Sequence, residues 1–99
     1  MPIDKPTTSY AALGDEYLSG TNGKPFDMAK AFLCYNLSVR HGEKEALLTL
    51  GYFYEVGKDT ESFYLAPNSK LALAFYERAV ELNVQEAQMR IESLRSKEN

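Results

Sequence analysis

Apolar and small side chains recur along this chain at spacings of three and four residues, which is the pattern of amphipathic helices. The pattern predicts five helices, over about residues 7–19, 27–42, 43–56, 68–83 and 85–97. The last helix has only a thin apolar stripe, made by Ala87, Ile91 and Leu94 among Gln, Glu, Arg and Ser. A helix that ends a stack and keeps one face in water is expected to look like this.

Residues that favour helix ends flank these segments. Ser, Thr, Asp and Asn side chains accept hydrogen bonds from the unpaired first-turn amides of a helix. The predicted N-terminal caps are Thr7 or Thr8, Asp27 and Asn68. Gly42 and Asn83 follow the second and fourth segments, and both residue types tolerate the left-handed backbone that closes a helix.

The segments form two copies of one longer pattern. LGDEYLSG, from Leu13 to Gly20, returns 37 residues later as LGYFYEVG. DMAKAFLCY, from Asp27 to Tyr35, returns 41 residues later as NSKLALAFY, so the second copy carries four extra residues in its middle loop. A period of roughly 35 to 45 residues built from two helical segments is typical of helical repeat proteins.

This skeleton, LGxxYxxG followed by a capping Asp or Asn and a helix that contains Tyr, resembles the Sel-one-like repeat family of the tetratricopeptide-like superfamily. The resemblance covers about residues 9–94, although a third copy starting at Ala87 reads Ile91-Glu92 in place of Leu-Gly. It implies an all-α fold, a right-handed α/α superhelix in one domain over residues 1–99. That domain would hold two repeats, about 9–45 and 46–86, and a capping helix at about 85–97. Family members look like scaffolds and adaptors for other proteins.

Two glycines lie inside predicted helices, Gly14 and Gly51. Each costs about 1 kcal/mol relative to alanine, so another interaction must offset that cost. We expect the partner helix to approach closely at both positions. The facing surface is predicted to carry Ala31 and Ala72, with Tyr17 and Tyr54 one turn further on.

Composition narrows the function classes. A chain of 99 residues with 44% hydrophobic content can bury one core. The 14 acidic and 11 basic residues give a net charge of −3, which argues against a nucleic-acid partner held by its phosphates. No segment approaches the roughly 20 apolar residues of a membrane helix, and MPIDKPTTS does not read as a secretory signal. We therefore expect no membrane partner and a cytoplasmic location.

Candidate chemistry is sparse. Cys34 lies in an apolar helical run and reads as a small buried hydrophobe, and His41 falls at a helix end. The glutamates at positions 43, 45, 81 and 86 look like solvated helix faces rather than a general acid and base. We expect no catalytic residue, no cofactor and no metal. A metal-dependent hydrolase that uses glutamates and His41 is a distant alternative.

Function is expected on the side chains that packing does not need. In the third helix these are Leu48, Tyr52 and Glu55, and their counterparts in the other helices include Ala11, Asp15, Met89 and Ser93. We expect Ala11, Leu48 and Met89 to form a ladder across the inner face, with Asp15, Tyr52 and Ser93 beside it. The ladder predicts a shallow groove for a protein or peptide partner. The alternative is that Leu48 and Met89 complete the core of a very small protein.

The inserted loop over residues 58–67 is the second candidate surface. Phe63 and Tyr64 are large apolar residues in a connection that should be solvated, and loops often carry function. The loop could instead fold back and cover the open end of the stack.

These features lead to a non-catalytic interaction module, a bacterial adaptor or scaffold whose concave face binds a protein. An immunity or inhibitor protein that neutralises a toxin by one-to-one binding is the alternative. Two repeats are fewer than the usual minimum of about three, so weak self-association by end-to-end stacking is also expected.

Overall fold

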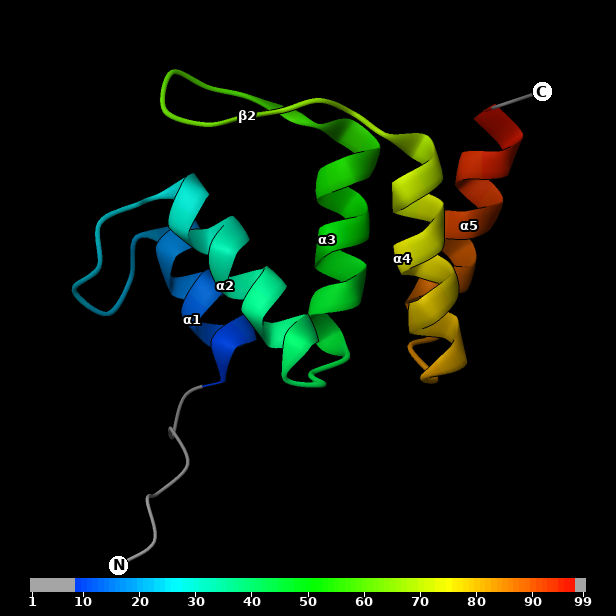
Figure 1. Cartoon of the computed structure of the whole chain (residues 1–99), viewed down its shortest axis with the longest axis horizontal. Helices are drawn as coiled ribbons and strands as arrows, with labels where there is room; N and C mark the ends of the chain where they lie inside the picture. Colours follow the sequence, from blue (N-terminus) through cyan, green and yellow to red (C-terminus); the bar gives the residue numbers. More distant parts are fainter. Residues whose placement is uncertain (1–8, 98–99) are drawn as a thin grey trace, which may run out of the picture.

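The computed structural model describes residues 9–97, which form five helices and one short hairpin (Figure 1). The helices are α1 (Tyr10–Ser19), α2 (Met28–Arg40), α3 (Glu45–Val56), α4 (Ser69–Glu81) and α5 (Glu86–Lys97). Between α3 and α4, strands β1 (Lys58–Asp59) and β2 (Tyr64–Leu65) pair antiparallel. Each helix packs against its neighbour along the chain, which gives the row of stacked helices of a helical-repeat solenoid, as predicted.

The predicted helix ends are present. Asp27 and Asn68 are the N-caps of α2 and α4, and each side chain accepts a hydrogen bond of 3.0 Å from the amide three residues on. Gly42 and Asn83 follow the C-caps of the same helices with φ of 79° and 67°. Thr7 and Thr8 lie outside the described residues, and the cap of α1 is Ser9, whose Oγ accepts from the Ala12 amide.

The core consists of two clusters that share α3. The first lies between α1, α2 and α3 and is centred on Ala31, Tyr35, Ala46, Leu50 and Phe53. The second lies between α3, α4 and α5 and is centred on Leu47, Ala72, Tyr76, Ala79, Ala87, Ile91 and Leu94. Because α3 contributes buried residues from adjacent faces to both clusters, it joins the first helix pair to the second.

The close approach expected at the helical glycines is seen at both positions. A Cβ atom on Gly14 would lie 2.8 Å from Cε1 of Tyr35, and one on Gly51 would meet the ring of Tyr76 in the same way. The nearest atoms therefore belong to Tyr35 and Tyr76 rather than to the fully buried alanines one turn earlier. Each ring packs directly against a glycine, because only a residue without a side chain leaves room for it.

The inserted loop forms the hairpin across one end of the helices (Figure 1). Phe63 packs against Phe32 of α2 with ring centroids 5.3 Å apart, and both Phe63 and Leu65 contact the first core cluster. The hairpin therefore covers the junction between α2 and α3. The loop does fold back onto the helices, as the alternative expected, but it covers this junction rather than an end of the stack.

Polar groups replace apolar ones at the first end of the stack. Phe53 is buried in the second repeat, and its counterpart 37 residues earlier is Glu16. The Glu16 carboxylate pairs with Lys24 at 2.8 Å and accepts a hydrogen bond from Asn22 at 2.6 Å. End-to-end stacking of two chains would have to remove these groups from water.

Glu43 is not the solvated residue that its sequence context predicts. Its carboxylate accepts hydrogen bonds from the Ser38 hydroxyl at 2.6 Å and from the α1 amides of Ala11 and Tyr10 at 3.1 and 3.4 Å. A negative charge at the amino end of α1 also interacts favourably with the helix dipole. Glu43 thus ties α1 to the turn that closes α2.

This contact predicts a pH dependence of stability. Burial alone would raise the pKa of Glu43, but the hydrogen bonds from Ser38, Ala11 and Tyr10 outweigh burial and hold the pKa below its ordinary value of 4.5. The charged carboxylate therefore stabilises the fold above that value, and the contribution is lost as the pH falls through the folded pKa. Urea denaturation should show that the free energy of unfolding falls less between about pH 7 and pH 3 for Glu43→Gln than for the wild-type chain. The exposed Glu45→Gln is the control, and equal profiles for the two variants would refute the role of Glu43.

Candidate binding groove

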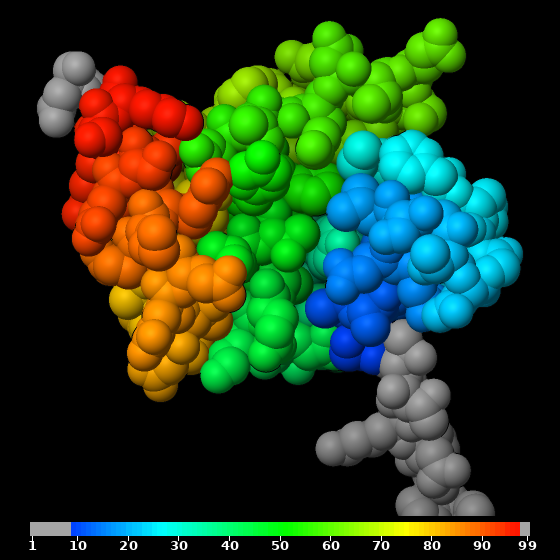
Figure 2. All heavy atoms as spheres, turned by 180° about the vertical axis from the view of Figure 1, so that it is seen from behind, coloured from blue at the N-terminus to red at the C-terminus, as the bar shows by residue number. Residues whose placement is uncertain are grey.

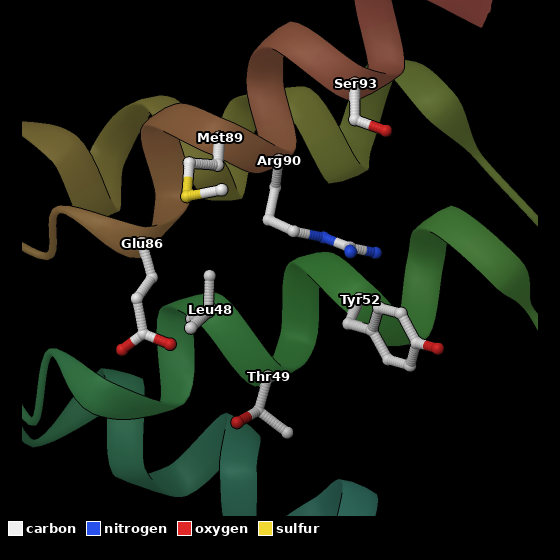
Figure 3. A pocket seen from close by; sticks show the side chains of 7 residues that line it. All are labelled: Leu48, Thr49, Tyr52, Glu86, Met89, Arg90 and Ser93. Atoms are coloured by element: carbon white, nitrogen blue, oxygen red, sulfur yellow. The ribbon is translucent and has the colours of Figure 1, made fainter.

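Helices α3 and α5 both pack on α4 and leave a groove between them on the face shown in Figure 2. Seven side chains line this groove, as Figure 3 shows: Leu48, Thr49 and Tyr52 from α3, and Glu86, Met89, Arg90 and Ser93 from α5. Its volume is about 720 Å³. We call this feature the α3/α5 groove.

Helical spacing decides which side chains line the groove. The lining residues of each helix fall on one face, at steps of one, three or four positions, and the other faces carry the buried residues of the core. Met89 is 72% exposed and Tyr52 is 45% exposed, so packing leaves both available. Leu48 is half-buried and also contacts the second core cluster, whereas Met89 is outside both clusters. Leu48 therefore does contribute in part to the core, as the alternative expected, whereas Met89 does not.

The predicted ladder is only partly brought together. Leu48, Tyr52, Met89 and Ser93 do lie on one groove. Their counterparts on α1 are elsewhere: Ala11 packs against the first core cluster. The exposed Asp15 accepts a hydrogen bond of 2.6 Å from the hydroxyl of Tyr35 and does not line the groove.

Glu55 has a structural role that differs from the predicted one. Its side chain is only 5% exposed, and its carboxylate accepts hydrogen bonds from the Tyr76 hydroxyl at 2.7 Å, Arg90 at 3.1 Å and Lys97 at 3.4 Å. Burial opposes ionisation, but these three donors outweigh it and lower the pKa of Glu55. Burial and the bond to Glu55 in turn raise the pKa of Tyr76 to about 12. Glu55 therefore holds α5 against the second helix pair and is not free for a partner.

Three groove residues were not predicted as site residues from the sequence: Thr49, Glu86 and Arg90. Arg90 makes contacts across the groove. Its guanidinium pairs with Glu55 and lies over the Tyr52 ring, 4.8 Å from the ring centroid. It thereby bridges the groove between α5 and α3 (Figure 3). Glu55 and Arg90 are 35 residues apart in the chain, and no local spacing links them.

The hairpin presents a smaller surface at one end of the helices. Val56, Tyr64 and Pro67 help to line a depression of about 230 Å³. Tyr64 is 67% exposed, whereas Phe63 is half-buried against Phe32. Of the two predicted loop residues, Tyr64 is therefore the more accessible.

The candidate metal-binding and catalytic side chains of the described residues do not gather at one site. Within residues 9–97, no three His, Cys, Asp or Glu side chains gather in an arrangement that could hold a metal ion. Cys34 is buried, which raises the pKa of its thiol, and the His41 ring stacks on Tyr10 at 4.8 Å. Over the same residues, none of the helices combines the length and the apolar content needed to cross a membrane.

Stacked antiparallel helix pairs with a shared core define the class of this protein as an α/α helical-repeat solenoid. Its structure is similar to that of a Sel1 repeat protein from Oxalobacter formigenes, with a TM-score of 0.71 and 27% sequence identity. The match covers 85% of this chain and 59% of that chain, so this chain spans little more than half of its length. The repeat is thus Sel1-like, as its sequence skeleton suggested. No protein-family model and no curated protein sequence matches this chain.

Proposed function

We propose that this chain is a non-catalytic interaction module that binds a protein partner in the α3/α5 groove. Fold alone does not determine function, so the proposal rests on the surface. Its main support is that Met89 and Tyr52 are large and exposed on one hollow surface of a Sel1-like repeat fold. Tyr, Met and Arg are enriched at protein interfaces, and all three line this groove.

Affinity capture with a groove variant tests the proposal. Tyr52→Asp/Met89→Asp places two charges on the groove while leaving Leu48, which contacts the core, unchanged. Interface anchors contribute more than about 1 kcal/mol each, so we expect capture of the partner from a host lysate to fall at least about tenfold. Circular dichroism confirms that the variant is folded. An inhibitor or immunity protein would in addition bind one-to-one and block the activity of its partner.

Tyr64→Asp is the control, because Tyr64 is an exposed aromatic residue like Tyr52 but lies on the hairpin instead. We expect it to capture the same partner as the wild-type chain. Loss of the partner with Tyr64→Asp and retention with the groove variant would move the binding surface to the hairpin.

A further inference from the structure

We infer that the occupant of the α3/α5 groove is an amphipathic helix whose apolar stripe is flanked by a basic residue at one end and an acidic residue at the other. This inference rests on the proposed function and adds the chemistry of the partner. It follows from three properties of the groove: its walls, its spacing and its charges.

The walls favour a helix over an extended strand. All seven lining residues belong to α3 and α5, which offer no strand edge, and beyond the first turn of each helix the backbone amides are paired within it. A peptide that binds as a strand needs an exposed sheet edge to satisfy its own backbone. A helix pairs its own backbone groups, so it can place apolar side chains on Leu48 and Met89 without burying unpaired amides and carbonyls.

The spacing of the lining side chains fits a helix as well. Leu48 and Tyr52 are one turn apart on α3, and Glu86, Arg90 and Ser93 rise at similar steps on α5. Ridges of side chains at three- and four-residue steps pack into grooves formed by the same steps on a neighbouring helix. An occupant helix would insert one such ridge between α3 and α5.

The charges differ between the two ends of the groove. Glu86 is exposed at the end where α5 begins. At the other end, the single negative charge of Glu55 is shared by Arg90 and Lys97, which leaves one net positive charge. A partner helix with one basic and one acidic end complements both, and like charges at either end would be repelled.

Synthetic peptides of about 15 residues test this inference, because that length is close to the minimum for helix formation. Three peptides share one stripe of leucines, and their ends carry Lys and Glu, Glu and Glu, or Lys and Lys. At low salt we expect the peptide with mixed ends to bind the wild-type chain about tenfold more tightly than the other two. Glu86→Lys makes both ends of the groove positive, so it should shift the preference to the peptide with two Glu ends.

Glu92→Lys is the control, because it makes the same charge change on an exposed position of α5 outside the groove. It should leave the preference unchanged. Equal binding of the three peptides, equal shifts for the two variants, or no peptide binding would overturn the helix inference. Groove-dependent capture of a protein would still support the proposed function in those cases. A second copy of this chain is the other possible occupant, and sedimentation of the chain alone tests for it. Dimers that become monomers in Met89→Asp would place a second copy in the groove and refute a partner helix.

Discussion

Gly51→Val is expected to lower the free energy of unfolding by about 3 kcal/mol, even though valine forms helices better than glycine. The side chain would have to enter the space of the Tyr76 ring, which is fully buried. The ring cannot move aside without breaking the hydrogen bond from its hydroxyl to Glu55. Native domains are stable by only about 5–15 kcal/mol, so urea denaturation should show a clearly lower midpoint for this variant.

Thr49→Val separates the local clash from the general effect of a valine in α3. Thr49 is half-buried on the groove side of the same helix, and replacing it should change stability by less than about 1 kcal/mol. Similar losses for the two variants would show that the clash with Tyr76 does not cause the loss of stability.

Glu55→Ala is the second large effect, with an expected loss of about 2–3 kcal/mol in the free energy of unfolding. The substitution leaves the Tyr76 hydroxyl without its acceptor inside the second core cluster and removes the partner of Arg90 and Lys97. Arg90 is partly exposed, so water limits the cost on its side. Thermal and urea unfolding would measure the loss.

Glu77→Ala provides the matched control for this ion pair. Glu77 also joins α4 to α5, through Arg95, but both side chains are mostly exposed. Exposed pairs contribute about 0–1 kcal/mol, so the control should be almost as stable as the wild-type chain. If Glu77→Ala were as damaging as Glu55→Ala, the buried position of Glu55 would not explain its effect.

The repeated pattern was enough to predict the helices and much of the groove, because both depend on local spacing. Asp27, Asn68, Gly42 and Asn83 determine helix ends through their own backbone and side-chain preferences. The groove residues of α3 could be recognised because the opposite face of that helix is more apolar.

The polar contacts could not be predicted from local spacing. Glu55 looked free because its donors are on α4 and α5, far along the chain. Glu43 looked solvated, yet it and Ser38 occupy the positions of Val84 and Ala79 in the second repeat. Comparison of the two repeats could have revealed this contact, because a polar pair in the first repeat replaces an apolar pair in the second.

The central claim is that the α3/α5 groove binds a partner, and hydrogen exchange of the chain alone and in complex with its captured partner tests it most directly. The expected result is slower exchange in residues 45–56 and 86–97, with α2 unchanged. Exchange slowed only in the hairpin over residues 58–65, or only in α2, would contradict the claim.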